Sequence, residues 1–393
     1  MGICLNMIVK NEATNIERLF TSVYPYIDYY VISDTGSTDN TVELIETLGK
    51  KFNIEGKVYK HEWIDFAHNR NLALNAAITL GKDGKRHCNW LLIIDADEEF
   101  AADDPNWHKS LVNGVSYLFK IKCNGAVFAR HGLLWIDGRD WKWQGKVHEQ
   151  PKDFSNSAKT TKVLNSNNVH IRSHSKVGAY SRRFKTNKDR AKFEINILRD
   201  ELQDANINKN NLNRYLQLAI AFMANDDYIE AIECVNLIIN LKYISYERKY
   251  QCLLYMSNCL FQQKEYFTSV ASCLLQAIYI YPERQEAYYY LGILYKKTGS
   301  AYFAKLMLEK AEQYSFPDRS RWFREDIYLW KNKYELVFVY SQLGMSTYST
   351  QLIKQLLENT DVPEIERGFL QALIKKFENY KLNINCGNLP DKS

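Results

Sequence analysis

Two aspartates separated by one residue, Asp95 and Asp97, follow the apolar run Trp90–Ile94. Two carboxylates at the end of a buried strand can hold one divalent ion, because Mg²⁺ and Mn²⁺ prefer oxygen ligands and complete their shells with substrate phosphates. Glu98 and Glu99 come next, and four adjacent carboxylates repel one another unless a cation lies among them. The pattern predicts a metal-assisted phosphate site, with an ordinary acidic turn as the alternative interpretation.

A second polar segment, Asp34-Thr-Gly-Ser-Thr-Asp39, follows the β-rich run Tyr29–Ser33. An aspartate at a strand end can accept hydrogen bonds from a nucleoside, and a glycine lets the backbone approach a ligand closely. A tight turn into a helix explains the same residues equally well, with Asn40 as the helix cap and Glu43 as its capping-box partner.

The elements that must position these carboxylates alternate in type over residues 1 to about 150. Such alternation predicts an α/β fold with a mostly parallel sheet covered by helices on both faces, and ligands bind beyond the carboxyl ends of its strands. The expected strands are Ile3–Val9, Tyr29–Ser33, Val58–Tyr59 and Trp90–Ile94, and the expected helices are Thr14–Val23, Asn40 to Gly49, and Phe66–Leu80.

From about Asn211 onward the sequence has helical periodicity almost throughout, and the pattern repeats. The tyrosines that open every second helix, Tyr228, Tyr266 and Tyr302, are spaced 38 and 36 residues apart. This rhythm resembles tetratricopeptide repeats, whose period is about 34 residues, and Gly292 is one of the small residues expected where paired helices touch. We predict two domains, residues 1–205 and an all-α repeat solenoid over residues 206–393.

Composition excludes several classes of protein. The chain is 46% hydrophobic and 25% charged, as in globular proteins, and no apolar run is long enough to span a bilayer. The eight cysteines form no C-x-x-C pair, so we expect a cytoplasmic protein without a disulfide framework. The formal net charge of +5 is concentrated between Arg172 and Lys192, a stretch that either closes over a bound nucleotide or is a solvated helix face. We expect no nucleic-acid binding, because this stretch lacks a stacking platform.

Four motifs in a fixed order carry a resemblance to a known family. They are Lys10-Asn-Glu12, Asp34 to Asp39, Asp65-Phe-Ala-His-Asn-Arg-Asn71, and Asp95 to Glu99. Together they resemble the family 2 glycosyltransferases of GT-A fold, in particular those that append tetratricopeptide repeats. The resemblance implies an inverting enzyme that takes a sugar from a nucleotide-sugar donor, with uridine preferred because relatives mostly use it, and that needs Mn²⁺ or Mg²⁺.

The resemblance also assigns roles to individual residues. It implies that Glu12 and Asp34 contact the nucleoside and that Arg70 lies near the base or the phosphate. Asp95 would face the ribose or the metal, and Asp97 would be the principal metal ligand.

The segment that ends at Glu149 resembles the region before the acceptor-side carboxylate of the family. Transfer with inversion requires a base opposite the departing diphosphate, which takes the acceptor proton as the new bond forms. Glu149 is the candidate base, and Asp140 and Glu98 are the alternatives. Trp141 and Trp143 either stack on a sugar ring or belong to the core.

A histidine, followed by Gly, Tyr and Arg at loosely matching distances, is the last element of the resemblance. His174 is the candidate third metal ligand and His170 the alternative, followed by Gly178, Tyr180 and Arg190. A buried or solvated histidine without a metal is the other interpretation.

The expected partners follow from the resemblance and from the repeats. They are a nucleotide-sugar donor, a protein or glycan acceptor, and a second copy of the chain bound through the helical repeats. Two other functions stay open at this point: an inactive GT-A and repeat scaffold, and a nucleotidyltransferase. The second would need a Gly-rich phosphate loop after the first strand, which Lys10-Asn-Glu12 does not provide.

Overall fold

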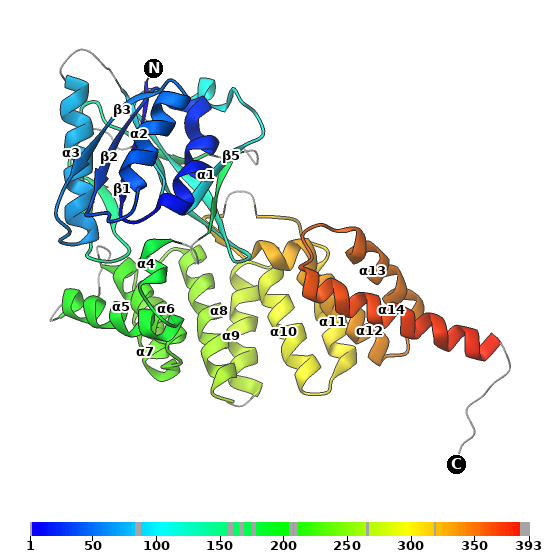
Figure 1. Cartoon of the computed structure of the whole chain (residues 1–393). Coiled ribbons are helices and arrows are strands. Elements are labelled where there is room, and N and C mark those ends of the chain that lie inside the picture. Colours follow the sequence, from blue (N-terminus) through cyan, green and yellow to red (C-terminus); the bar gives the residue numbers. More distant parts are fainter. Residues whose placement is uncertain are drawn as a thin grey trace. The chain divides into compact units, whose positions relative to one another are not determined.

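The computed structural model describes residues 2–82, 88–155, 160–164, 169–174, 178–203, 207, 211–264, 267–317 and 320–385. It divides into two compact units, residues 1–243 with 318–322, and residues 244–317 with 323–393 (Figure 1). The predicted boundary between residues 205 and 206 lies outside the described residues and stays a prediction, and Tyr266 also lies outside them.

The first unit is built on a mixed sheet whose parallel part carries the predicted strands. Strands β3 (Glu55–Lys60), β2 (Tyr29–Asp34), β1 (Ile3–Val9) and β4 (Trp90–Ile93) lie side by side in that order. β1 is buried on both faces between β2 and β4, which is why its sequence is apolar almost without interruption. The four strands expected from the sequence are therefore confirmed, with β3 longer than expected.

The sheet continues beyond β4 through strands that pair in both directions. β7 (Ala126–Trp135) is antiparallel to β4 and to β6 (Val115–Cys123), and β11 (Val169–Ser173) joins β6 to β5 (Glu98–Ala102). β10 (Thr160–Val163) also pairs with β6, and β8 (Trp141–Gln144) forms a separate hairpin with β9 (Gln150–Asp153).

Helices cover both faces of the parallel strands, as the alternation of elements predicts. Helices α1 (Ala13–Val23) and α2 (Thr41–Lys51) pack on one face, where their apolar residues share a core with alternate residues of β1 and β2. Helix α3 (Phe66–Lys82) and the β8–β9 hairpin pack on the other face.

The two ends of α2 differ from the sequence prediction. The Asn40 side chain makes no capping hydrogen bond; instead Asp39 Oδ1 accepts one from the Thr41 backbone N–H at 3.1 Å. Gly49 lies inside the helix and does not end it. A Cβ on Gly49 would lie 2.9 Å from the Tyr30 ring, so the glycine lets α2 approach β2 closely.

Four further helices belong to the first unit: α4 (Ala179–Arg182), α5 (Asn187–Leu202), α6 (Leu212–Ala224) and α7 (Tyr228–Ile239). Helix α5 begins with a capping box in which Thr186 and Asp189 exchange hydrogen bonds. Helices α5 and α6 pack on each other, and so do α6 and α7.

The second unit consists of consecutive helices that pack in pairs, as predicted. The pairs are α8 (Tyr246–Gln262) with α9 (Phe267–Ile280), α10 (Gln285–Lys297) with α11 (Ala301–Ala311), and α12 (Asn332–Gln342) with α13 (Ser346–Glu358), followed by α14 (Glu364–Asn385). A Cβ on Gly292 would lie 2.7 Å from Leu308, which explains the small residue at this contact of α10 with α11. None of the helices in the described residues is long and apolar enough to cross a bilayer.

Candidate active site

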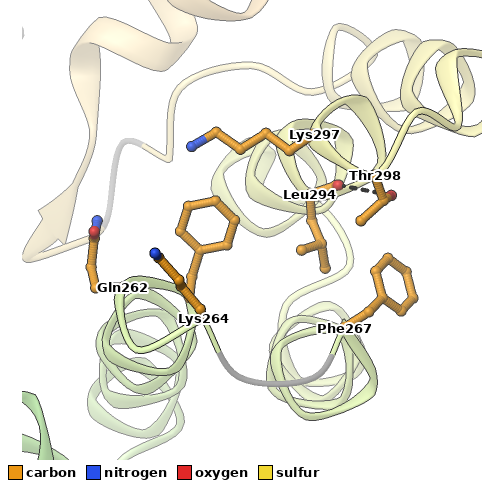
Figure 2. A pocket seen from close by; sticks show the side chains of 7 residues that line it. Gln262, Lys264, Phe267, Leu294, Lys297 and Thr298 are labelled. Carbon is orange, nitrogen blue, oxygen red and sulfur yellow. Dashed lines mark hydrogen bonds between the residues drawn. The ribbon is translucent and has the colours of Figure 1, made fainter.

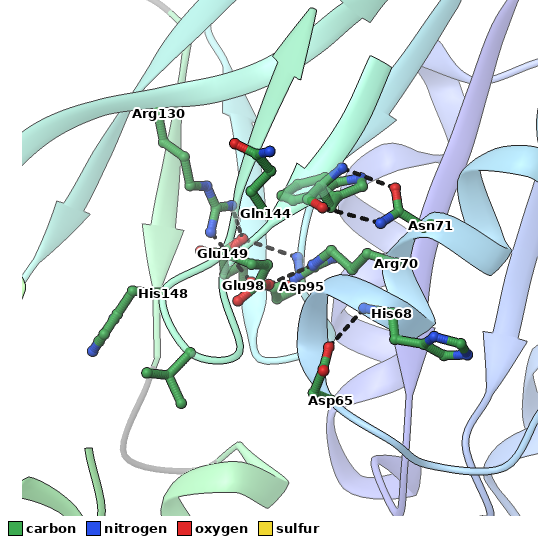
Figure 3. A network of polar contacts seen from close by, with 12 residues as sticks. Asp65, His68, Arg70, Asn71, Asp95, Glu98, Arg130, Gln144, His148 and Glu149 are labelled. Atoms are coloured by element: carbon green, nitrogen blue, oxygen red, sulfur yellow. Dashed lines mark hydrogen bonds and ion pairs between the residues drawn. The ribbon is translucent and has the colours of Figure 1, made fainter. Parts of the chain in front are cut away.

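Arg70, near the start of α3, joins two of the predicted site residues. Its Nη2 donates to Asp95 Oδ1 at 2.5 Å, and its Nε donates to Glu149 Oε1 at 2.6 Å (Figure 3). The guanidinium is buried and lies over the Trp143 ring, 4.9 Å from its centre. One arginine thus links the end of β4 to the start of β9, and brings a predicted donor residue and the predicted base together.

Arg130 on β7 completes this charge network, and no sequence pattern had indicated it. Its Nη1 donates to Asp95 Oδ2 at 3.2 Å, and its Nη2 donates to Glu98 Oε2 at 2.6 Å. Burial by itself raises the pKa of Asp95, but Arg70 and Arg130 outweigh it and lower the pKa to about 2. Both carboxylate oxygens of Asp95 are therefore engaged by arginines.

Asp97 is in the opposite electrostatic situation. Among the described residues, no other residue donates a hydrogen bond to its carboxylate or forms an ion pair with it. Burial, together with the nearby negative charges of Asp95, Glu98 and Glu12, raises the pKa of Asp97 to about 7. Such a carboxylate fits a bound divalent cation, which would offset the repulsion and take its other ligands from a phosphate.

His174 and Gly178, which follow β11, lie against Asp97. The His174 backbone N–H donates to the Asp97 carbonyl oxygen at 2.9 Å. A Cβ on Gly178 would lie 2.2 Å from Asp97 Oδ2, so only glycine leaves this carboxylate its space. The glycine of the loosely matched His, Gly, Tyr and Arg series thus lies at the candidate metal ligand.

Glu12 and Asp34 lie at the carboxyl ends of the neighbouring strands β1 and β2. Asp34 is buried and accepts a hydrogen bond from the Ser37 backbone N–H at 3.1 Å. The Glu12 carboxylate accepts from Asn15 Nδ2 and from the Ala179 backbone N–H, both at 2.6 Å. Glu12 therefore anchors the start of α4 at the edge of the sheet where Asp34 and Asp97 lie.

Residues 4–114 match the family described as Glycosyl transferase family 2. This segment is a family 2 glycosyltransferase domain. Strands β1 to β4 and all the carboxylates described above except Glu149 fall within it.

Curated proteins with similar sequences are also named glycosyltransferases. An uncharacterized glycosyltransferase of Rickettsia bellii is 30% identical over 40% of the chain and 44% of its own length. Glycosyltransferase SunS, derived from the SPbeta prophage of Bacillus subtilis, is 25% identical over 42% of the chain and 38% of its own length. The chain thus spans less than half the length of the curated relatives it matches.

Among solved structures, a thermophilic TPR protein of Thermus thermophilus is 16% identical, with a TM-score of 0.35. The similarity covers 47% of this chain and 91% of that one. A TM-score below 0.5 does not by itself establish a shared fold.

The two candidate histidines differ in their surroundings. The His174 imidazole lies 3.4 Å from Glu99 Oε2, and the His174 backbone is hydrogen-bonded to the backbone of Asp97. His170 is buried on β11, and burial lowers its pKa to about 4. In the part of the chain that the structure describes, no group of three or more His, Cys, Asp or Glu side chains is arranged to hold a metal. A metal at Asp97 would therefore take most of its ligands from the donor and from water.

The remaining predicted residues lie outside the charge network. Trp141 and Trp143 are each 7% exposed and belong to the core beneath the family 2 domain's sheet, so the core interpretation holds and the sugar platform does not. The Asp140 side chain is 53% exposed and pairs with Lys142 at 3.4 Å.

A second cluster surrounds Glu194 of α5, which sequence reasoning had missed. Glu194 is buried, accepts a hydrogen bond from the Tyr180 hydroxyl at 3.2 Å, and lies 3.1 Å from His148 Nε2. Burial opposes the charged form, but the hydrogen bond from His148 and the charge of Arg190 keep the pKa of Glu194 below its usual value. The spacing of Tyr180 and Arg190 was the available signal for this cluster.

The second unit has a concavity of its own (Figure 2). It has a volume of about 340 Å³ and is lined by Phe261, Gln262, Lys264, Phe267, Leu294, Lys297 and Thr298. The Lys297 ammonium lies over the Phe261 ring at 4.4 Å. None of the predicted site residues lines this cavity.

Proposed function

We propose that the protein is a metal-dependent, inverting glycosyltransferase that moves a sugar from a UDP-linked donor to a protein or glycan acceptor. One observation carries the proposal: a family 2 domain presents Asp97, a carboxylate without a cationic partner in the described chain, at the strand edge of Glu12 and Asp34. Phosphates with a divalent cation suit this charge, whereas a phosphate alone would be repelled.

The reaction would be a single displacement. The acceptor oxygen forms a bond to the anomeric carbon of the donor, and Glu149 takes the proton of that oxygen. The bond from the anomeric carbon to the diphosphate breaks, and its electron pair leaves with the nucleoside diphosphate. Mn²⁺ or Mg²⁺ held by Asp97 would supply charge neutralisation for the leaving diphosphate.

The side chains around Glu149 support this role. Its carboxylate is 11% exposed, and its Oε1 accepts a hydrogen bond from Arg70, which orients the group. Among the described residues no side chain donates to its Oε2, so this oxygen is left for the acceptor proton. Arg70 also fixes Asp95, and thereby couples the position of the base to the end of β4. The two alternative bases have other partners: Asp140 pairs with Lys142, and Glu98 pairs with Arg130.

The donor site is tested by thermal unfolding with UDP, with and without Mn²⁺. A ligand at about 100 times its dissociation constant adds about 2.7 kcal/mol of stability, which raises the melting temperature by a few degrees. We expect this shift only with UDP and metal together, and we expect EDTA to remove it. If no nucleoside diphosphate shifts the protein, the inactive scaffold becomes the better interpretation.

Glu149→Gln tests the base. We expect transfer to fall roughly 10²- to 10⁴-fold, because an amide cannot take the proton, while the shift with UDP and metal stays as in the wild type. Initial rates with the active sugar donor measure the loss. Asp140→Asn is the matched control and should keep wild-type rates; the reverse pattern would assign the base to Asp140.

We further propose that the helical repeats bind the protein acceptor or a second copy of the chain. The paired helices α8 to α13 form the kind of extended surface that repeat proteins use for binding. The cavity lined by Lys264 and Lys297 offers positive charge and aromatic surface for an acidic segment of such a partner.

A further inference from the structure

The loop that leads into Glu149 is held by an arginine from a helix of the second half of the chain. Arg214, on α6, donates from Nη2 to the Gln144 carbonyl oxygen at 2.9 Å. Its Nη1 donates to the carbonyl oxygens of Val147 at 2.5 Å and His148 at 3.3 Å. A single guanidinium thus binds the backbone on both sides of the turn between β8 and β9 (Figure 3 shows Gln144, His148 and Glu149).

Two residues of this loop have backbone conformations that are uncommon in proteins. Gly145 has a φ of +104° and His148 a φ of +49°, both in the left-handed region. A Cβ on Gly145 would lie 1.2 Å from Arg214 Nη2, so the guanidinium occupies the space that any other side chain would need. Backbone in sparsely populated conformations persists only where its surroundings hold it.

Helix α5 adds two further ties to the same loop. The Lys146 backbone N–H donates to Glu201 Oε1 at 2.5 Å, and His148 Nε2 lies 3.1 Å from Glu194. Glu201 also pairs with Arg214 at 3.4 Å, and the Arg214 side chain is only 17% exposed. The loop is therefore clamped between α5, α6 and the hairpin, in the residues immediately before Glu149.

We propose that Arg214 is a positioning residue that fixes the backbone of Glu149 for proton abstraction. The inference rests on the proposed function, because it takes Glu149 as the base. Arg70 holds the carboxylate through one hydrogen bond, and that bond alone leaves the main chain free to shift. Displacements of about 1 Å at a reacting group can cost about 10²-fold in rate, so a clamp on the backbone is of direct use in catalysis.

The test compares Arg214→Met, Arg214→Lys and Gly145→Ala in the whole chain of 393 residues. We expect kcat to fall about 10²-fold in Arg214→Met, with the donor KM changed less than about twofold, and Arg214→Lys to recover part of the loss. Gly145→Ala should reproduce Arg214→Met, because its Cβ takes the place of the guanidinium. Arg199→Met is the matched control: Arg199, on α5, lies 5.0 Å from the centre of the Phe222 ring of α6, and its loss should leave kcat unchanged.

The double variant Arg214→Met with Glu149→Gln separates positioning from general folding. If Arg214 acts through Glu149, adding Arg214→Met to the Glu149→Gln protein lowers kcat only slightly further. The losses in kcat from the two substitutions are then not additive. Additive losses, or a folded Arg214→Met protein with wild-type kcat, overturn the inference while leaving the proposed function intact.

Amide hydrogen exchange gives a readout that does not need activity. Residues 145–149 should exchange faster in Arg214→Met than in the wild type. Unchanged protection of these amides would overturn the inference about Arg214. This readout does not depend on sugar transfer; absence of transfer in the wild type would instead refute the proposed function.

Discussion

Asp97→Asn is expected to abolish stabilisation by UDP with Mn²⁺ and to lower sugar transfer by at least about 10²- to 10³-fold. The reason is the position of this carboxylate: it lies beside Asp95, Glu98 and Glu12, and no cationic side chain among the described residues pairs with it. The amide keeps the size of the side chain and removes the charge that would attract the metal. Thermal unfolding with UDP and metal, and initial transfer rates, measure the two effects.

The same substitution should stabilise the protein in the absence of ligand. The pKa of Asp97 is about 7 in the folded protein and near 4 in the unfolded chain, so its contribution to stability is present at low pH and is lost as the pH rises toward 7. At pH 8 we therefore expect ligand-free Asp97→Asn to melt at a higher temperature than the wild type, and at pH 4 the difference should vanish.

Asp103→Asn is the control for both effects, because Asp103 is an exposed acid in the same unit. It should leave the UDP shift and the pH dependence unchanged. A wild-type response to UDP and metal in Asp97→Asn would show that the metal site lies elsewhere.

Arg70→Met is expected to lower the free energy of unfolding by about 3–5 kcal/mol and to abolish sugar transfer. Removing the guanidinium leaves the carboxylates of Asp95 and Glu149 without their shared buried partner. Breaking a buried ion pair from one side is costly, because the remaining charge stays buried. Arg70→Lys should recover only part of the loss, since one ammonium cannot reproduce the fork that binds both carboxylates. Urea unfolding, monitored with UDP binding and transfer, measures these changes.

Arg139→Met is the matched control for Arg70→Met. Arg139 and Asp153 form an ion pair with side chains 7% and 6% exposed, outside the charge network of the site. We expect a comparable loss of stability, while the fraction of protein that stays folded keeps its response to UDP and metal. Loss of that response in both variants would mean that the stability loss alone explains the effect of Arg70→Met.

The sequence determined the four strands β1 to β4, most of the helices and the edge of the sheet at which the acidic residues gather. Uninterrupted apolar runs identify β1, β2 and β4, because strands buried on both faces have no solvent side. Asp34 is the last residue of β2 and Asp97 lies shortly after the end of β4, so their place at the carboxyl edge follows from local order along the chain.

The ends of α2 show where local sequence patterns predicted the structure wrongly. Gly49 has the typical residue type for a helix end, but α2 continues to Lys51, and the glycine instead allows the close contact with Tyr30. Trp141 and Trp143 also could not be assigned from their residue type, because tryptophan can either stack on a sugar or pack in a core. Their burial against the sheet assigns them to the core.

The charge pairing of the site was decided only by the tertiary structure. Arg130 and Arg214 lie in no motif, and they meet their partners because β7 pairs with β4 and because α6 packs beside the β8–β9 turn. The sequence alone assigned Asp95 and Asp97 to one metal site, yet folding gives the first to two arginines and leaves the second without a cationic partner among the described residues. The period of a pattern along the chain fixes an element, whereas the charge state of a side chain depends on groups that only folding brings near it.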